Sequence, residues 1–136
     1  MATYLPWLDR AGGASPHIHG WGFYFERLFW FHPARSPLWT EVVLGALALL
    51  GAVASLAGKR LANADPRLAR FLTFYTLAMI CAYTLISYKT PWCLLNFVLP
   101  AVLLAGIGAS VLWQAVGSRP GRWVLGVALG VGALHL

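Results

Sequence analysis

Long apolar runs alternate with short polar segments along this chain. A run of roughly 18 or more such residues can cross a bilayer, so we expect membrane helices at about 38–57, 68–88 and 92–116. A fourth run, 123–136, is shorter than the ~20 residues that span the hydrocarbon layer. The pattern predicts an all-α fold, a polytopic transmembrane helical bundle with three full spans and a partial fourth. The partial span suggests a piece of a longer protein.

The N-terminal part of the chain, residues 1–37, differs from these runs because glycine and proline interrupt it. Residues 17–32 are dense in aromatic side chains, and four residues recur there at helical spacing: Trp21, Tyr24, Phe25 and Leu28. Aromatic-rich amphipathic segments partition to the membrane–water interface. We therefore expect two regions, an extracytoplasmic interfacial aromatic segment at 1–37 and a transmembrane helical region at 38–136.

Small residues in the expected spans indicate where helices pack closely, because lipid supplies no hydrophobic drive for their association. The first span carries a face made of Gly45, Ala48, Ala52 and Ser55. In the third span Gly106 and Ser110 form a second small pair. Pro100 in the same span removes a backbone donor and is expected to kink the helix.

Polar residues predict where the second span begins and which face it turns inward. Asp65 and Pro66 are typical of a helix cap and a first helical position. A polar stripe at heptad-like spacing should face other helices or a wet cavity rather than lipid. It consists of Thr73, Thr76, Tyr83, Thr84 and Ser87.

Composition and charge agree with a membrane protein. Of the residues, 60% are hydrophobic and 10% are charged, whereas soluble domains have about 25% charged residues. Basic residues gather in and beside two loops, 58–67 and 117–122, which the positive-inside rule assigns to the cytoplasm. That placement accounts for the net charge of +6 without a nucleic-acid partner. Residues 1–37 and the turn after the second span then lie outside the plasma or inner membrane.

One short turn, Tyr88-Lys89-Thr90-Pro91-Trp92, separates the second and third spans. Lys89 is the only charged residue between Arg70 and Arg119. Two interpretations stay open. A cation at headgroup depth suits the phosphate of a lipid, and a lysine at a helix end also reaches ordinary headgroups with its flexible stem.

The aromatic segment holds the other candidate site residues. His17 and His19 are candidates for the polar lining of a site, although no third ligand at ordered spacing supports a metal. Arg27 has the geometry that suits a phosphate. Glu26 is a candidate base for deprotonating an acceptor hydroxyl, or simply part of a charged edge. The sequence assigns neither a metal site nor a firm catalytic residue.

The stretch from Ser87 to Pro100 resembles the "YKTPW…LP" turn of a family of bacterial and archaeal membrane proteins, and His19–Leu28 is similar to that family's "HG.P.YYY..L" stretch. This family resembles the protein mannosyltransferases of glycosyltransferase family 39, of the GT-C superfamily. It includes the flippase activity-associated proteins of archaeal N-glycosylation. The match covers most of residues 17–116.

The resemblance implies a membrane glycosyltransferase that takes a sugar from a polyprenyl-phosphate carrier on the extracytoplasmic face. It implies that Lys89, flanked by Tyr88 and Trp92, contacts the carrier phosphate, and that the His17–Arg27 region lines the same cavity. The family's acidic catalytic residues follow a first membrane helix, so the base is expected upstream of this chain. The intact family allows a divalent metal, but no cofactor motif is evident here. The expected partners are membrane lipid, the carrier, and the rest of the polytopic protein or neighbouring helices.

Two alternatives stay open beside the transferase. One is a non-enzymatic membrane helper that binds or translocates lipid-linked sugars. The other is a small structural membrane subunit without a carrier ligand. The donor sugar and the acceptor are not specified by the sequence.

Overall fold

The computed structural model of the chain describes residues 16–32, 40–58, 61 and 64–135, and this part is helical. In chain order its elements are α2 (Phe23–Phe29), α3 (Val42–Leu56), α4 (Pro66–Leu85), the 3₁₀ turn η1 (Pro91–Leu94), α5 (Leu95–Ala115) and α6 (Arg119–His135). Apart from isolated bridge residues at Ile18, Phe31 and Tyr88, the described residues contain no β structure. The prediction of an all-α fold is confirmed for them.

Two stretches are long and apolar enough to cross a membrane, α4 and the continuous stretch Pro91–Ala115. They correspond to the predicted second and third spans. The predicted first span, 38–57, contains the 15-residue helix α3, which is roughly 22 Å long at 1.5 Å per residue against ~30 Å of hydrocarbon. The bundle of three full spans is therefore not confirmed, because α3 falls short of that length.

Local chemistry sets the limits of α3. At its start the Thr40 hydroxyl accepts a hydrogen bond from the backbone N–H of Val42 at 3.3 Å. At its end Gly58 has φ of +67°, the left-handed conformation with which many helices stop. The Glu41 N–H donates to the Leu28 carbonyl at 2.8 Å and so joins the start of α3 to α2.

The start of α4 confirms the predicted cap. The Asp65 side chain accepts hydrogen bonds from the N–H groups of Arg67 at 2.6 Å and Leu68 at 3.3 Å. Pro66 occupies the first turn, where a backbone N–H would have no acceptor within the helix, so the lack of an N–H in proline costs no hydrogen bond. The helix begins at Pro66, as the cap predicted, two residues before the approximate start of the predicted span.

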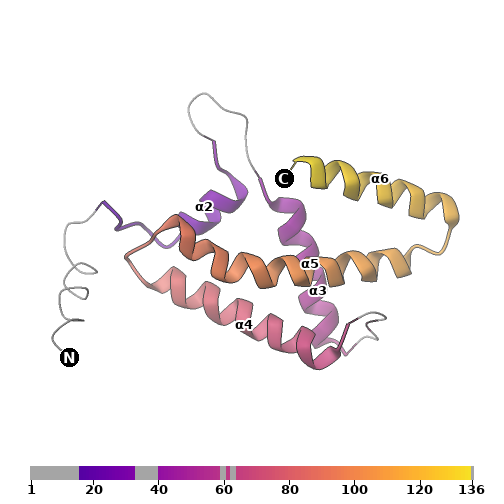
Figure 1. The fold of residues 1–136 in the computed structure, drawn as a ribbon, viewed down its shortest axis with the longest axis horizontal. Coiled ribbons are helices and arrows are strands. Elements are labelled where there is room, and N and C mark those ends of the chain that lie inside the picture. The colour runs from indigo at the N-terminus through magenta and orange to yellow at the C-terminus, as the bar shows by residue number, and fades with distance from the viewer. Residues whose placement is uncertain (1–15, 33–39, 59–60, 62–63, 136) are drawn as a thin grey trace.

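The centre of the fold is the crossing of α3 and α5, which Figure 1 shows as a steep crossing with α4 running alongside α5. The backbones touch where Gly51 of α3 meets Gly108 of α5. A Cβ atom built on Gly51 would lie 2.0 Å from the Leu104 carbonyl oxygen, and one on Gly108 would lie 2.0 Å from the Leu47 oxygen. Glycine is therefore required at both positions for this close approach.

The small-residue prediction is right for α3 and misplaced on α5. Ala48 and Ser55 are buried, and Gly45 packs beneath the Phe29 ring of α2. Gly106, however, has open space where a Cβ would be. The packed face of α5 contains Leu104, Ala105 and Gly108 instead, because these residues follow the side of the helix that α3 crosses.

Hydroxyl groups join α3 to α4. Ser55 and Thr73 lie 3.0 Å apart, oxygen to oxygen, and both are almost completely buried. Each hydroxyl also lies within hydrogen-bond distance of a carbonyl of its own helix, 2.8 Å from that of Ala52 for Ser55 and 2.9 Å from that of Ala69 for Thr73. Because a hydroxyl has one proton, one of the two donates to its carbonyl and the other donates across to its partner hydroxyl. The predicted polar stripe therefore does face helices at Thr73 and Thr76, whereas Ser87 lies exposed beyond the helix end.

The predicted kink at Pro100 does not interrupt the helix. Pro100 lies inside α5, which continues from Leu95 to Ala115, and its ring is buried. The N-terminal end of α5 is held to α4 by Asn96, whose side-chain amide donates to the Tyr83 hydroxyl at 2.9 Å.

Replacing Gly51 with alanine should force α3 and α5 apart and lower the free energy of unfolding by about 1–3 kcal/mol, the usual cost of overpacking. The matched control is Gly106→Ala, which meets no atom within 4 Å and should leave stability the same or raise it by up to ~1 kcal/mol. Denaturant unfolding in detergent, followed by circular dichroism, measures both. Equal stability of the two variants would contradict the backbone contact.

Candidate functional site

The two stretches that the sequence singled out lie against each other at one end of the molecule. The His19 N–H donates to the Ser87 carbonyl at 3.2 Å, and the Lys89 N–H donates to the His17 carbonyl at 2.8 Å. Between these bonds Ile18 and Tyr88 form an antiparallel bridge. We call this paired region, residues 17–19 with 87–89, the Lys89 junction. The stretches around His19 and Lys89 therefore lie side by side.

Lys89 is the most completely engaged residue of the junction. Its side chain is 1% exposed. Its ammonium group donates to three backbone carbonyls, those of Tyr83 at 2.9 Å, Thr84 at 2.8 Å and Ile86 at 2.5 Å. Three donors meet three acceptors, so the ammonium has its full complement of hydrogen bonds.

These acceptors explain why a lysine stands here. The last carbonyls of a helix have no partner within it, and they carry the negative end of the helix dipole. Lys89 closes the end of α4 by folding back over it, a role that basic side chains near a helix C-terminus can fill. Burial lowers the pKa of Lys89 from its ordinary value of 10.5, whereas acceptance by the carbonyls favours the charged form.

Tyr24 of α2 covers the buried ammonium. Its ring centroid lies 5.6 Å from the Lys89 nitrogen, a cation–π distance. Its hydroxyl donates to the Thr90 carbonyl at 3.3 Å. Edge contacts with Tyr83 and Phe97 complete the packing. Burial and the nearby Cys93 raise the pKa of Tyr24, which therefore keeps its donating proton at neutral pH.

The aromatic residues beside Lys89 occupy different environments. Trp92 is 66% exposed at the start of the 3₁₀ turn, where its indole is open to the surroundings. Tyr88 is half-buried, and its ring meets the edge of the His17 ring at a centroid distance of 5.3 Å. Trp92 is thus free to sit at an interface, while Tyr88 helps to hold the junction together.

A second group of candidates gathers around the Phe23 ring of α2. The His19 ring stacks on it with centroids 4.1 Å apart. The Arg27 guanidinium carbon lies 5.3 Å from the same ring and 4.7 Å from that of Phe31. His19 and Arg27 are therefore held on one aromatic side chain. We call this group, His19, Phe23 and Arg27, the Phe23 cluster.

The acidic candidate Glu26 lies exposed in the first turn of α2. Among the residues that the structure describes, no group of three histidine, cysteine, aspartate or glutamate side chains could hold a metal ion. The assignment of a base to Glu26 stays a prediction.

An apolar cavity of about 200 Å³ lies between α2, α3, α4 and α5. Phe25 and Phe29 of α2 line it together with residues of the three longer helices, and Glu41 is the one ionisable side chain among its lining residues. Thr73 and Thr76 also line it, but their hydroxyl groups bond to carbonyls of their own helix. The cavity is suited to hydrocarbon rather than to a polar ligand.

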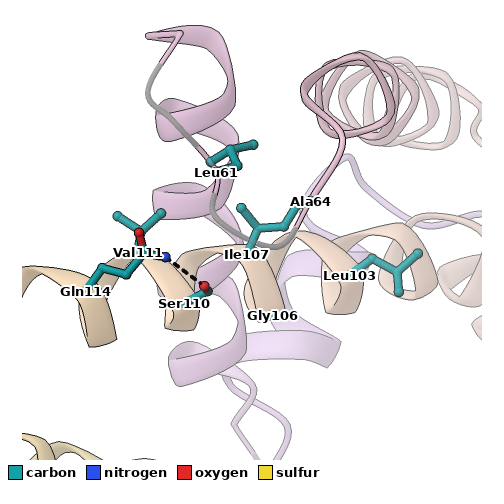
Figure 2. A pocket seen from close by; sticks show the side chains of 8 residues that line it. All are labelled: Leu61, Ala64, Leu103, Gly106, Ile107, Ser110, Val111 and Gln114. Atoms are coloured by element: carbon teal, nitrogen blue, oxygen red, sulfur yellow. Dashed lines mark hydrogen bonds between the residues drawn. The ribbon is translucent and has the colours of Figure 1, made fainter.

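A larger hollow of about 310 Å³ lies beside α5, away from the Lys89 junction, and is shown in Figure 2. Leu61 and Ala64 border it from the α3–α4 connection, and Gly106 and Ile107 from α5. Its polar side chains are engaged with each other, since the Gln114 amide donates to the Ser110 hydroxyl at 3.1 Å. None of its lining residues is ionisable, so we assign it no chemistry.

Sequence reasoning did not identify Tyr24 as part of the site, although it named the residue within the helical pattern of 17–32. The sequence did not reveal the hydrogen-bond acceptor of Tyr24, because that acceptor, the Thr90 carbonyl, belongs to a residue 66 positions away along the chain. The predicted contact between Lys89 and a lipid phosphate stays a prediction. In this arrangement the ammonium donates its three hydrogens to backbone carbonyls and has none left for a phosphate.

Comparison of the chain with protein-family models, with curated proteins and with solved structures finds no match.

Replacing Lys89 with methionine should leave the carbonyls at the end of α4 without their donor and lower the free energy of unfolding by at least about 2 kcal/mol. Arg67→Met is the matched control, since it removes the same charge from an exposed side chain in the first turn of α4. Denaturant unfolding of the purified protein, without added lipid, measures the difference. If the Lys89 variant were as stable as the control, the lysine would have no structural role.

Proposed function

We propose that this chain is the donor-binding part of a membrane glycosyltransferase that uses a polyprenyl-phosphate-linked sugar. One observation carries the proposal. The two stretches that resemble the transferase family, around His19 and around Lys89, are paired backbone to backbone in the Lys89 junction. These two stretches lie some seventy residues apart along the chain, yet they form one local structure. Residues that bind the same ligand must lie close together in this way.

In this proposal the phosphate of the carrier binds at the Phe23 cluster. Arg27 is exposed, and its contacts among the described residues are with aromatic rings rather than with a carboxylate. A guanidinium so placed keeps its forked donors for a phosphate. His19 stands on the same ring as a second donor. Lys89 then acts as a positioning residue that holds this surface in place.

The apolar cavity gives the carrier's hydrocarbon chain a place close to the phosphate site. Phe23 and Phe25 are two residues apart on α2, one in the cluster and the other lining the cavity. A polyprenyl chain is apolar along its length, and burial of such a surface is favourable at about 25 cal/mol per Å². One short helix thereby contributes to both halves of an amphiphilic ligand.

The membrane arrangement belongs to the same proposal. We place α4 and the stretch Pro91–Ala115 across the membrane, with α3 and α6 as shorter membrane-embedded helices. The exposed arginines at the start of α4, Arg67 and Arg70, then lie on the cytoplasmic side. The Lys89 junction and α2 consequently face outward, where lipid-linked sugars are used.

Photolabelling of the intact protein with a benzophenone-bearing polyprenyl phosphate should modify residues 17–31. Arg27→Ala should reduce labelling about 10-fold or more, the value of one charge-assisted contact. Arg67→Ala, which removes an arginine from the opposite end of α4, should leave it unchanged. Equal labelling of both variants, or equal labelling by the corresponding polyprenol without phosphate, would contradict the proposed site.

A turnover assay distinguishes the transferase from the alternative of a non-enzymatic helper. With a polyprenyl-phosphate-linked sugar as donor, a transferase releases polyprenyl phosphate when acceptor is present. Glu26→Gln should slow that release while leaving photolabelling intact if Glu26 is the base. Labelling without any release by the intact wild-type protein, with any sequence upstream of this chain included, would identify a carrier-binding helper instead.

A further inference from the structure

The connection between α5 and α6 forms a second polar surface that the proposed function does not use. It lies directly after Ala115, where one of the two candidate membrane spans ends. The side chain of Ser118 accepts a hydrogen bond from the Gly121 N–H at 3.3 Å as α6 begins. A Cβ on Gly126 would lie 3.6 Å from the Trp113 ring, so α6 folds back against α5. We call this connection the elbow.

A hollow of about 390 Å³ opens at the elbow. Two arginines and two tryptophans line it: Trp113, Arg119, Arg122 and Trp123. Both indoles are exposed to a large extent, 44% for Trp113 and 77% for Trp123. Neither of the two cavities described above has a cationic side chain or a tryptophan in its lining.

The two arginines are held differently. The Arg122 Nε donates to the Val116 carbonyl at 2.9 Å, which fixes the guanidinium at the elbow. Arg119 is exposed. Neither arginine forms an ion pair with any residue in the described part of the chain. A ligand anion that binds either arginine therefore has no carboxylate of the described residues to displace.

From this arrangement we infer that the elbow binds the phosphate of an anionic phospholipid headgroup. Guanidinium groups match phosphate oxygens with paired hydrogen bonds. Indole rings settle at the depth where headgroups meet the hydrocarbon, and basic pockets at helix ends bind anionic headgroups. The site lies at the opposite end of α5 from the Lys89 junction. It rests on the membrane placement of α5 proposed above, but not on sugar transfer.

Native mass spectrometry of the purified protein in detergent, titrated with dioleoylphosphatidylglycerol or dioleoylphosphatidylcholine, tests the inference. We expect the anionic lipid to bind more tightly. Arg119→Ala should weaken its binding about fivefold and the double variant Arg119→Ala/Arg122→Ala roughly 30-fold. Arg67→Ala removes one exposed arginine elsewhere and should change nothing. If the double variant loses its helical circular dichroism, the single variant Arg119→Ala provides the test instead. The Arg119 side chain is exposed, so its removal should not unfold the protein.

A competition arm separates the lipid from free phosphate. Inorganic phosphate at millimolar concentration should not displace the phosphatidylglycerol, because it lacks the acyl and glycerol groups that contact the indoles. Displacement by phosphate alone would assign the hollow to a soluble anion and overturn the lipid assignment. The site itself would be refuted by equal phosphatidylglycerol affinity in the Arg119 and Arg67 variants, or by equal affinity for the two lipids.

Discussion

The burial of one ammonium group among three backbone carbonyls organises the end of the molecule on which the proposed function depends. A charge taken out of water is tolerated when its hydrogen bonds are complete, and Lys89 achieves this with the carbonyls of Tyr83, Thr84 and Ile86. The bonds end α4 and draw the following residues back over it. Strand-like pairing with residues 17–19 and the packing of Tyr24 then follow from the position of that turn.

A second constraint, the contact of Gly51 with Gly108, acts at the middle of the fold. It brings the backbones of α3 and α5 together where no larger residue fits. In a lipid environment such close packing replaces the hydrophobic drive that joins helices in water. The hydroxyl pair of Ser55 and Thr73 adds the third helix. The Lys89 junction thus lies at the end of helices that pack together through Gly51, Gly108 and the hydroxyl groups of Ser55 and Thr73.

Several features could be read from the sequence because they depend on neighbours along the chain. Asp65 and Pro66 predicted the start of α4, and two of the three apolar runs predicted as full spans form helical stretches of that length. The Gly51–Gly108 contact could not be predicted, since the chain has 14 glycines and only the crossing of two helices selects a pair. Lys89 stood out by its isolation, but its acceptors are carbonyls, which every residue has. The pattern of side chains therefore did not reveal them.

The most direct measurement of this account is the distance from the Lys89 ammonium to the end of α4 in a lipid bilayer. With Lys59 replaced by arginine, Lys89 is the remaining lysine and its nitrogen can be labelled with ¹⁵N, together with ¹³C at the isoleucine carbonyls. Dipolar recoupling by solid-state NMR should give about 3.5–4 Å to the Ile86 carbonyl carbon, as expected for a hydrogen-bonded N–H···O=C group. A distance beyond ~6 Å would place the ammonium away from the helix end and contradict the account.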